Sequence, residues 1–365
     1  MALPQGIAAA TVAYEAWLGS HLRLVPDDLA EKHRRMAKGP FQFLRATYYR
    51  WVERWEKVEP DLRDAPEVLS IGDLHFENFG TWRDADGRLA WGVNDFDEAF
   101  PLPWTQDLVR LATSLTLAVM QRELAVRPEE ACAELLSGYA AALEQGGKPI
   151  VLAEDHPWLE RIAIARRRRA ARFWRRLRGP EVAVPESAER ALRQFLPDPL
   201  LEVKVIHRVA GLGSLGRERF VALGRWRGGA VAREAKALAP SACSWLKAPA
   251  APAELYYARL LRTATRASDP YFGVEDGWVV RRLAPDCAKI ALRDLPLRYL
   301  GRLLFYQGYE TGNVHLGTQG AADDVLKDLR SRKGDWLARA ALRMCKEVQN
   351  DWKDWRAARR RPSLP

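Results

Sequence analysis

Two short segments, IGDLHFENFG at residues 71–80 and VNDFDEA at 93–99, constrain this chain more than any other feature. Short apolar runs at 79–82 and 89–93 flank the pair Asp86-Gly87, and an Asp-Gly pair supplies the positive φ angles that a tight hairpin turn needs. The spacing therefore predicts a β-hairpin within residues 70–100. Its open end would bring Asn78 and Asp95 face to face.

Asp73, Asn78 and Asp95 have the residue types and the order that kinase-type phosphoryl transfer uses. In such sites one loop carries an Asp that accepts the substrate's hydroxyl proton and an Asn that holds Mg²⁺, and a later turn supplies an Asp that holds the metal against the nucleotide phosphates. Mg²⁺ needs few protein oxygens when phosphate and water complete its shell. The pattern predicts Asp73 as the catalytic base and Asn78 and Asp95 as metal ligands. Taken singly, each could be a turn or cap residue, and only the combination favours a site.

A glycine-rich run, Gly211-Leu212-Gly213-Ser214-Leu215-Gly216, is the second candidate for chemistry. Glycines at this spacing let backbone N–H groups approach phosphates, either in a strand-turn-strand cover over ATP or in a strand-turn-helix dinucleotide fold. Residues 219–223 alternate like a strand and Arg227-Gly228-Gly229 forms a turn. We therefore expect a β-hairpin covering ATP, with Gly211, Gly213, Ser214 and Gly216 binding the nucleotide. A plain glycine turn is the alternative.

These segments resemble those of known families. Gly72 to Asn78, Asn94 to Ala99 and the run DLVRLA at 107–112 resemble the catalytic stretch of aminoglycoside and choline phosphotransferases, within the protein-kinase-like superfamily. With residues 36–45, 208–216, 233–235 and 280–283 added, the pattern is more similar to a bacterial family of uncharacterised proteins, domain of unknown function 2252. The resemblance covers most of the chain. It implies an α+β, protein-kinase-like fold of two lobes, with ATP and Mg²⁺ as cofactors.

The order of the segments differs from that of kinase-like chains, in which the glycine loop precedes the catalytic loop. Circular permutation would reconcile the two orders, because the termini of compact domains are commonly close together. On this hypothesis residues 1–195 form a helical lobe with the catalytic hairpin, 196–290 a smaller β-rich lobe that covers the nucleotide, and 291–365 helices that return to the first lobe. Apolar positions between Leu295 and Val314 predict a helix, which resembles the one preceding the catalytic loop in phosphotransferases.

One residue departs from the family pattern. Kinases use a lysine on the strand after the glycine loop to contact nucleotide phosphates, and this chain has Arg233 where the family pattern has lysine. We assign Arg233 to phosphate binding, although the geometry of arginine differs and activity could be altered or lost. Lys204, Lys236 and Lys289 are possible substitutes. For each of them we expect a solvated surface lysine instead.

Other features narrow the class of protein. No apolar run approaches the roughly 20 residues of a membrane span, and Cys132, Cys243, Cys287 and Cys345 lack metal or disulfide spacing, so we expect a cytoplasmic protein without a membrane segment. His75 lies inside the catalytic loop, where orienting that loop is its expected task. The oligomeric state is left open.

The net charge of +10 is concentrated in an arginine-rich stretch at 161–178, interrupted by Phe173 and Trp174, and in Arg356 and Arg359 to Arg361. A solvated helix face is the commoner outcome for such a stretch, and binding to nucleic acid is a less favoured alternative. The sequence favours an ATP-dependent phosphotransferase acting on a small hydroxylated or anionic molecule. The alternatives are a nucleotide-binding regulatory protein without turnover and a nucleic-acid-associated protein that uses the arginine-rich stretch.

Overall fold

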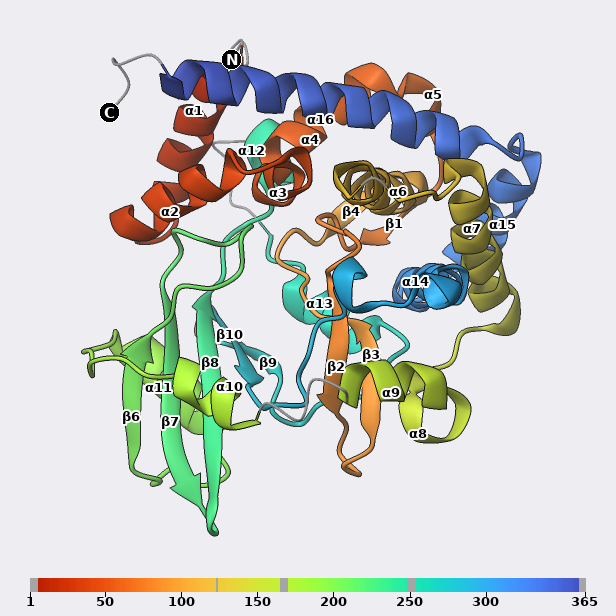
Figure 1. Ribbon diagram of the computed structural model, residues 1–365. Helices are drawn as coiled ribbons and strands as arrows, with labels where there is room; N and C mark the ends of the chain where they lie inside the picture. The colour runs from red at the N-terminus through yellow and green to blue at the C-terminus, as the bar shows by residue number, and fades with distance from the viewer. Residues whose placement is uncertain (1–5, 123, 165–169, 248–253, 361–365) are drawn as a thin grey trace.

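The computed structural model describes residues 6–122, 124–164, 170–247 and 254–360 (Figure 1). The chain is a mixed α+β protein with 52% helix and 16% strand, which confirms the predicted class. The helices are α1 (Ile7–Gly19), α2 (Pro26–Met36), α3 (Pro40–Ala46), α4 (Tyr48–Val58), α5 (Pro60–Arg63), α6 (Trp104–Gln121), α7 (Pro128–Gln145), α8 (Leu152–Asp155), α9 (Pro157–Ile164), α10 (Ala170–Arg176), α11 (Glu186–Gln194), α12 (Ala242–Lys247), α13 (Tyr257–Thr263), α14 (Leu300–His315), α15 (Ala321–Ser331) and α16 (Trp336–Arg360).

The strands of the described residues form three antiparallel sheets, in the orders β1-β4, β2-β3-β5 and β6-β7-β8-β10-β9. Their bounds are β1 (Glu67–Ser70), β2 (Phe79–Arg83), β3 (Leu89–Val93), β4 (Phe100–Pro103), β5 (Ile150–Val151), β6 (Val203–His207), β7 (Arg219–Trp226), β8 (Gly229–Ala237), β9 (Gly273–Glu275) and β10 (Trp278–Arg282).

The predicted hairpin at 70–100 is present as β2 and β3. Phe79 pairs with Val93 at its open end, and Gly87 has φ of +77° in the turn, as the Asp-Gly pair requires. Asp84 tightens the turn, because its carboxylate accepts hydrogen bonds from the backbone N–H groups of Asp86 and Arg88. The hairpin leads the chain directly from the loop at 71–78 to the loop at 94–99.

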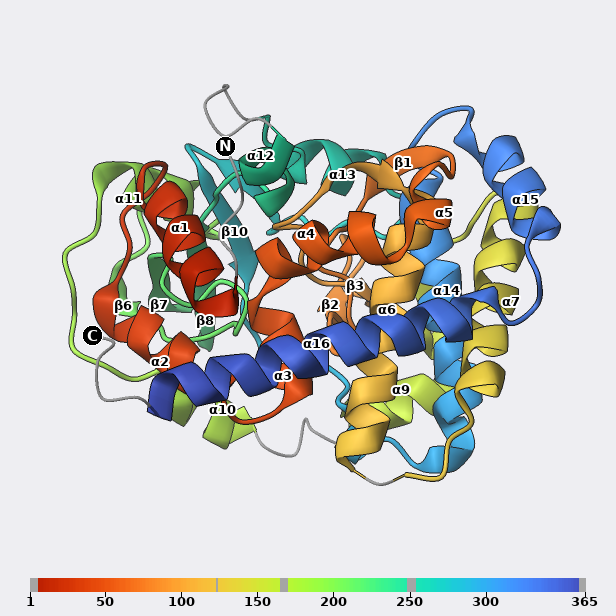
Figure 2. The same cartoon turned by 90° about the horizontal axis from the view of Figure 1, so that it is seen from above.

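Buried helices support this hairpin. Helix α6 is buried along nearly its whole length, and α16 crosses it (Figure 2). Helices α7 and α14 approach closely because glycines face the contact. A side chain at Gly138 would overlap with the backbone of Phe305, and one at Gly308 with that of Leu135. The predicted helix at 295–314 is α14, which begins at Leu300 after two 3-10 turns.

The five-stranded sheet has a cover on each face. Side chains of α11 pack with Phe220 and Ala222 on one face, whereas Leu177, next to α10, packs with Val221 and Ala232 on the other. The segment between β6 and β7 is the predicted glycine loop, and it joins two strands as expected for a hairpin. It reaches from the sheet toward α2 and α3 (Figure 1).

Candidate functional site

Helix α6 holds the start of the loop at 71–78 in place. Asp107, in the first turn of α6, accepts hydrogen bonds from the backbone N–H groups of Ile71 at 2.7 Å and Gly72 at 2.9 Å, and its carboxylate also contacts His315 at 3.0 Å. Gly72 has φ of +80°, and a side chain there would overlap with the carbonyl of Glu98. The chain therefore turns sharply after β1. Asp107 therefore has a structural role at this turn.

This turn exposes Asp73 to a cavity while α6 holds its carboxylate. Arg110 Nε lies 3.0 Å from Asp73 Oδ1, and a second nitrogen of the same guanidinium donates to that oxygen. The guanidinium is fully buried between the rings of Tyr48 and Trp51, each 4.9 Å away. Burial raises the pKa of Asp73, and Arg110 opposes that rise. Arg110 thus orients the carboxylate predicted as a base.

Asn78 and Asp95 meet at the open end of the hairpin. Asn78 Nδ2 donates to the carbonyl oxygen of Asp95 at 3.0 Å and to that of Asp73 at 3.4 Å. Within the described residues Asn78 Oδ1 is buried and has no hydrogen-bond partner. A buried acceptor without a donor is costly, and an amide oxygen is a suitable ligand for Mg²⁺. The residues therefore fit the predicted metal, with phosphate and water as the remaining ligands.

The carboxylate of Asp95 is paired with a lysine. The ammonium of Lys236 on β8 lies 2.9 and 3.0 Å from its two carboxylate oxygens and 2.6 Å from Asp97 Oδ1. Burial alone would raise the pKa of Asp95, but Lys236 and Arg281 hold it below its usual value. Burial and the charge of Asp95 raise the pKa of Asp97. A buried lysine therefore neutralises the two carboxylates where a metal would do so.

The expectation that Lys236 is a solvated surface lysine is wrong, because only 3% of the residue is exposed. Lys204 is exposed as expected, whereas Lys289 is half-buried and lines the cavity. Burial, then Arg45 and Arg281, lower the pKa of Lys289 to about 8. Two of the three lysines considered thus lie at the site.

Arg233 occupies a different position from the one expected of it. Its Nε donates to the carbonyl oxygen of Phe195 at 2.6 Å, and its guanidinium stacks 4.0 Å from the ring of Tyr271. Successive side chains of a strand point to opposite faces, so Arg233 and Lys236, three positions apart on β8, point in opposite directions. Arg233 does not line the cavity. This parity was the available signal that Arg233 and Lys236 cannot both face the site, and it is Lys236 that contacts Asp95.

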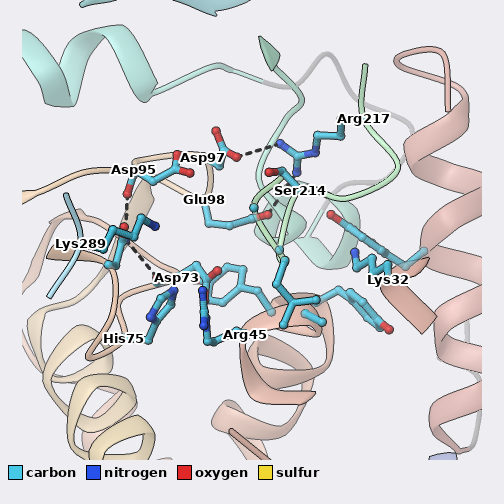
Figure 3. A pocket seen from close by; sticks show the side chains of 18 residues that line it. Lys32, Arg45, Asp73, His75, Asp95, Asp97, Glu98, Ser214, Arg217 and Lys289 are labelled. Carbon is cyan, nitrogen blue, oxygen red and sulfur yellow. Dashed lines mark hydrogen bonds and ion pairs between the residues drawn. The ribbon is translucent and has the colours of Figure 1, made fainter. Parts of the chain in front are cut away.

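The glycine loop closes the cavity over Asp73. Gly211, Gly213 and Ser214 line it together with Asp73, Asn78 and Asp95 (Figure 3). A Cβ atom at position 213 would lie 3.3 Å from Asp73 Oδ2 and 3.0 Å from the carbonyl oxygen of Arg45. Two segments more than a hundred residues apart thus lie on one cavity, as predicted.

Gly216 has another task. Its φ is +99°, a side chain there would overlap with Leu29 of α2, and its carbonyl accepts a hydrogen bond from the Val25 N–H at 2.8 Å. Gly216 is not among the residues that line the cavity. It therefore anchors the end of the loop to α2.

His75 lines the cavity as a neutral, buried ring. Burial and then the charge of Arg45 hold the pKa of His75 well below its ordinary value. Its Nδ1 accepts a hydrogen bond from the backbone N–H of Glu77 at 3.2 Å. This contact agrees with the expected role of His75 in shaping the loop.

The cavity as it stands is small, about 50 Å³. A water molecule needs roughly 10–15 Å³ of such space, so the cavity holds a few waters and no nucleotide. Among the described residues no three His, Cys, Asp or Glu side chains gather to hold a metal by themselves. Because the cavity is so small, a nucleotide would have to enter by separation of the glycine loop from the loop at 71–78.

The arginine-rich stretch lies partly outside the described residues, since Arg166 to Arg169 fall in the range 165–169. Arg161, Arg172 and Arg176, from α9 and α10, line a second cleft of about 930 Å³, which Lys289 also borders. None of the described helices is long and apolar enough to cross a membrane.

Part of the chain matches a known protein family. Residues 23–177 match the model of a family described as "Uncharacterized protein conserved in bacteria (DUF2252)". The matched range includes Asp73, Asn78 and Asp95, so it supports the family resemblance for this part of the chain. It ends before the glycine loop and spans less than half of the chain, so the resemblance expected for residues 208–216, 233–235 and 280–283 stays a prediction. No curated protein and no solved structure gives a significant match.

Proposed function

We propose that this chain is an ATP-dependent phosphotransferase with a permuted kinase-like arrangement, acting on a small hydroxylated or anionic molecule. The observation that carries the proposal is the single cavity shared by Asp73, Asn78 and Asp95 with the glycine loop. A glycine loop, a metal-binding Asn and Asp and a positioned Asp base are the parts of a kinase-type site. We expect such an enzyme to act in the cytoplasm without a membrane partner.

The five-stranded sheet supports the comparison in a further respect. In protein kinases the phosphate-binding lysine is on the third strand, after the strands that flank the glycine loop. Here β6 and β7 flank the loop, and Lys236 is on β8, the third strand of the five-stranded sheet when its strands are taken in chain order. We therefore transfer the phosphate-binding role from Arg233 to Lys236.

Helix α14 supports the permutation. Its Gln307 Nε2 donates to the carbonyl oxygen of Phe76 at 3.0 Å, and its Glu310 accepts from the backbone N–H of Val93 at 3.0 Å. A C-terminal helix thus holds both ends of the N-terminal catalytic segment. On the permutation hypothesis the β-rich lobe and this helix would precede that segment in an unpermuted chain.

The side chains divide the work of phosphoryl transfer. Asp73, held by Arg110, would accept the proton of the acceptor hydroxyl, and Asn78 and Asp95 would hold Mg²⁺. Bound Mg²⁺ would neutralise charge on the nucleotide phosphates. The backbone of the glycine loop and Lys236 would contact those phosphates, and closure of the loop would exclude water from the reaction.

A second function, nucleotide binding without turnover, is favoured by one observation: both key carboxylates are already paired, Asp73 with Arg110 and Asp95 with Lys236. Turnover separates the two functions. We expect Asp73→Asn to keep Mg·ATP binding and to lower transfer or hydrolysis of labelled γ-phosphate by about 10²–10⁴-fold.

Asp61→Asn, a change of the same type at an exposed position, is the matched control and should retain activity. Asp95→Ala should instead weaken Mg·ATP binding itself. A wild-type chain that binds Mg·ATP and transfers no phosphate to any acceptor or to water would favour the regulatory function.

A further inference from the structure

Lys32 is a buried cation in the same cavity that the proposed reaction leaves unused. It lies on α2, a helix with many charged residues, yet only 3% of the residue is exposed. Its side chain lines the cavity, beside Ser214 and opposite Asp73 and Lys289 (Figure 3). Lys32 therefore belongs to the cavity and not to the solvated face of its helix.

No hydrogen bond or ion pair joins the Lys32 ammonium to another group in the described part of the chain. The ammonium is not among the fully enclosed polar atoms without a partner, so it keeps surface open to the cavity. The acidic side chains that attract it have nearer partners. Glu15 Oε1 lies 2.7 Å from His33 Nε2, Glu98 Oε2 accepts from the Ala242 N–H at 2.7 Å, and Asp73 is held by Arg110. Lys32 thus lies near negative charge and also near the positive charge of Arg217, which lowers its pKa further, and it has no dedicated partner.

Such an arrangement is costly for folding. A buried ammonium loses its hydration and regains that free energy only through close pairing or hydrogen bonds. Burial lowers the pKa of Lys32, and the charge of Glu15 opposes this only in part. A methionine would fill the same space without the penalty. The lysine therefore indicates that an anion occupies the cavity when the protein works.

The position of Lys32 in the cavity indicates that the anion belongs to the acceptor molecule and not to the nucleotide. Asp95, with Asn78 and Lys236 in contact with it, lies on the Lys289 side of the cavity (Figure 3). Lys32 lies on the opposite side and comes, like Tyr14 and Tyr49, from the N-terminal helices, and Asp73 lines the same cavity. The nucleotide phosphates would be held by the first group. The second group would then border the molecule whose hydroxyl Asp73 receives.

We propose that Lys32 binds the anionic group, a carboxylate or a phosphate, of the molecule that accepts the phosphoryl group. This inference rests on the proposed function and gives the substrate class: a small hydroxylated acid. The hydroxyl lies at Asp73 and the anionic group at Lys32. Specificity for an acid over a neutral alcohol follows from the ammonium.

Calorimetric titration of the full chain tests this with glycerol, glycerate and glycerol 3-phosphate, in EDTA and without nucleotide. We expect glycerate or glycerol 3-phosphate to bind, and the one that binds more tightly identifies the group as carboxylate or phosphate. Lys32→Met should weaken that binding by about tenfold or more, because a charge-assisted hydrogen bond is lost. Lys38→Met, the same change at an exposed position next to α2, should have no effect.

Two further measurements on Lys32→Met separate substrate binding from a structural role. The melting temperature should rise, since a buried charge without a dedicated partner is removed, and Mg·ATP affinity should stay within twofold. Three results would each overturn the inference: no binding of either anion to the wild type, binding of glycerol as tight as that of the anions, or an unchanged anion affinity in Lys32→Met. So would a lower melting temperature with a parallel loss of Mg·ATP affinity. Because the anion titration contains no nucleotide, it can succeed even if the chain binds no ATP.

Discussion

Replacing Lys236 by methionine removes the ammonium that lies between Asp95 and Asp97 and leaves two half-buried carboxylates facing each other. Removing one member of a buried ion pair typically costs about 3–5 kcal/mol, because the remaining charge stays buried. The Asp95 side chain is 28% exposed and that of Asp97 is 12% exposed, so water screens part of the repulsion. We expect a loss of about 2–4 kcal/mol at pH 8.

The corresponding shift in melting temperature follows from the length of the chain. The entropy of unfolding is about 2.1 cal/mol/K per residue, so for 365 residues each kcal/mol lowers the melting temperature by about 1.3 °C. The variant should therefore melt about 3–5 °C below the wild type. Lys38→Met serves as the control, since that lysine is exposed.

The loss should depend on pH and on metal. In the wild type the lowered pKa of Asp95 contributes stability that is present above pH 3.8 and is lost below it. Without Lys236 the pKa values of both carboxyls in the folded state rise above 3.8, so protonation relieves the repulsion as the pH falls. Differential scanning calorimetry at pH 8 and pH 5 should show a smaller deficit at pH 5. Mg²⁺ should raise the melting temperature of the variant more than that of the wild type, because it replaces the ammonium.

An equal melting temperature of variant and wild type at pH 8 would refute this reasoning. It would mean that the ion pair between Lys236 and the two aspartates makes no net contribution in the folded protein. A deficit that grows on acidification would contradict the sign of the electrostatic argument.

Two further predictions concern residues beside the cavity. Burial raises the pKa of Glu98 to about 7, so the stability that its carboxyl contributes is full below pH 4.5 and is lost as the pH rises from 4.5 to 7. In chemical denaturation the free energy of unfolding of Glu98→Gln should therefore gain about 3 kcal/mol relative to the wild type between pH 4 and pH 8. A difference that stays constant with pH would argue against the raised pKa. Gly216→Ala should lower the free energy of unfolding by about 1–3 kcal/mol, because of the positive φ and the overlap with Leu29. Adding Leu29→Ala should recover the part that comes from the overlap. If the double variant shows no recovery, the end of the loop does not pack on α2.

The parts of the site that depend on local sequence could be predicted. The Asp-Gly turn and its flanking apolar runs specify the β2–β3 hairpin, and the hairpin brings Asn78 to Asp95 over a short stretch of chain. The alternation after Gly216 likewise specifies a strand. In these cases the turn chemistry and the side-chain period act over about twenty residues or fewer.

Contacts between distant segments could not be predicted in the same way. Lys236 lies 141 positions from Asp95 in the chain, and its burial depends on how the five-stranded sheet faces the loop at 94–99. The family pattern drew attention to Arg233, although counting alternate positions along β8 would have put Lys236 on the opposite face. Lys32 shows the same limit, since its charged helix looks solvent-exposed until α2 packs against the glycine loop.

The most direct test of a Mg·ATP site built from Asn78, Asp95 and the glycine loop is the affinity for ATP with and without Mg²⁺, measured by isothermal titration calorimetry. The two protein oxygens leave most of the coordination shell of the metal to phosphate and water, so metal and nucleotide should bind together. We expect tight binding of ATP only with Mg²⁺ and a weakened Mg·ATP affinity in Asp95→Ala. Equal affinity for ATP with and without Mg²⁺ would contradict the proposed site.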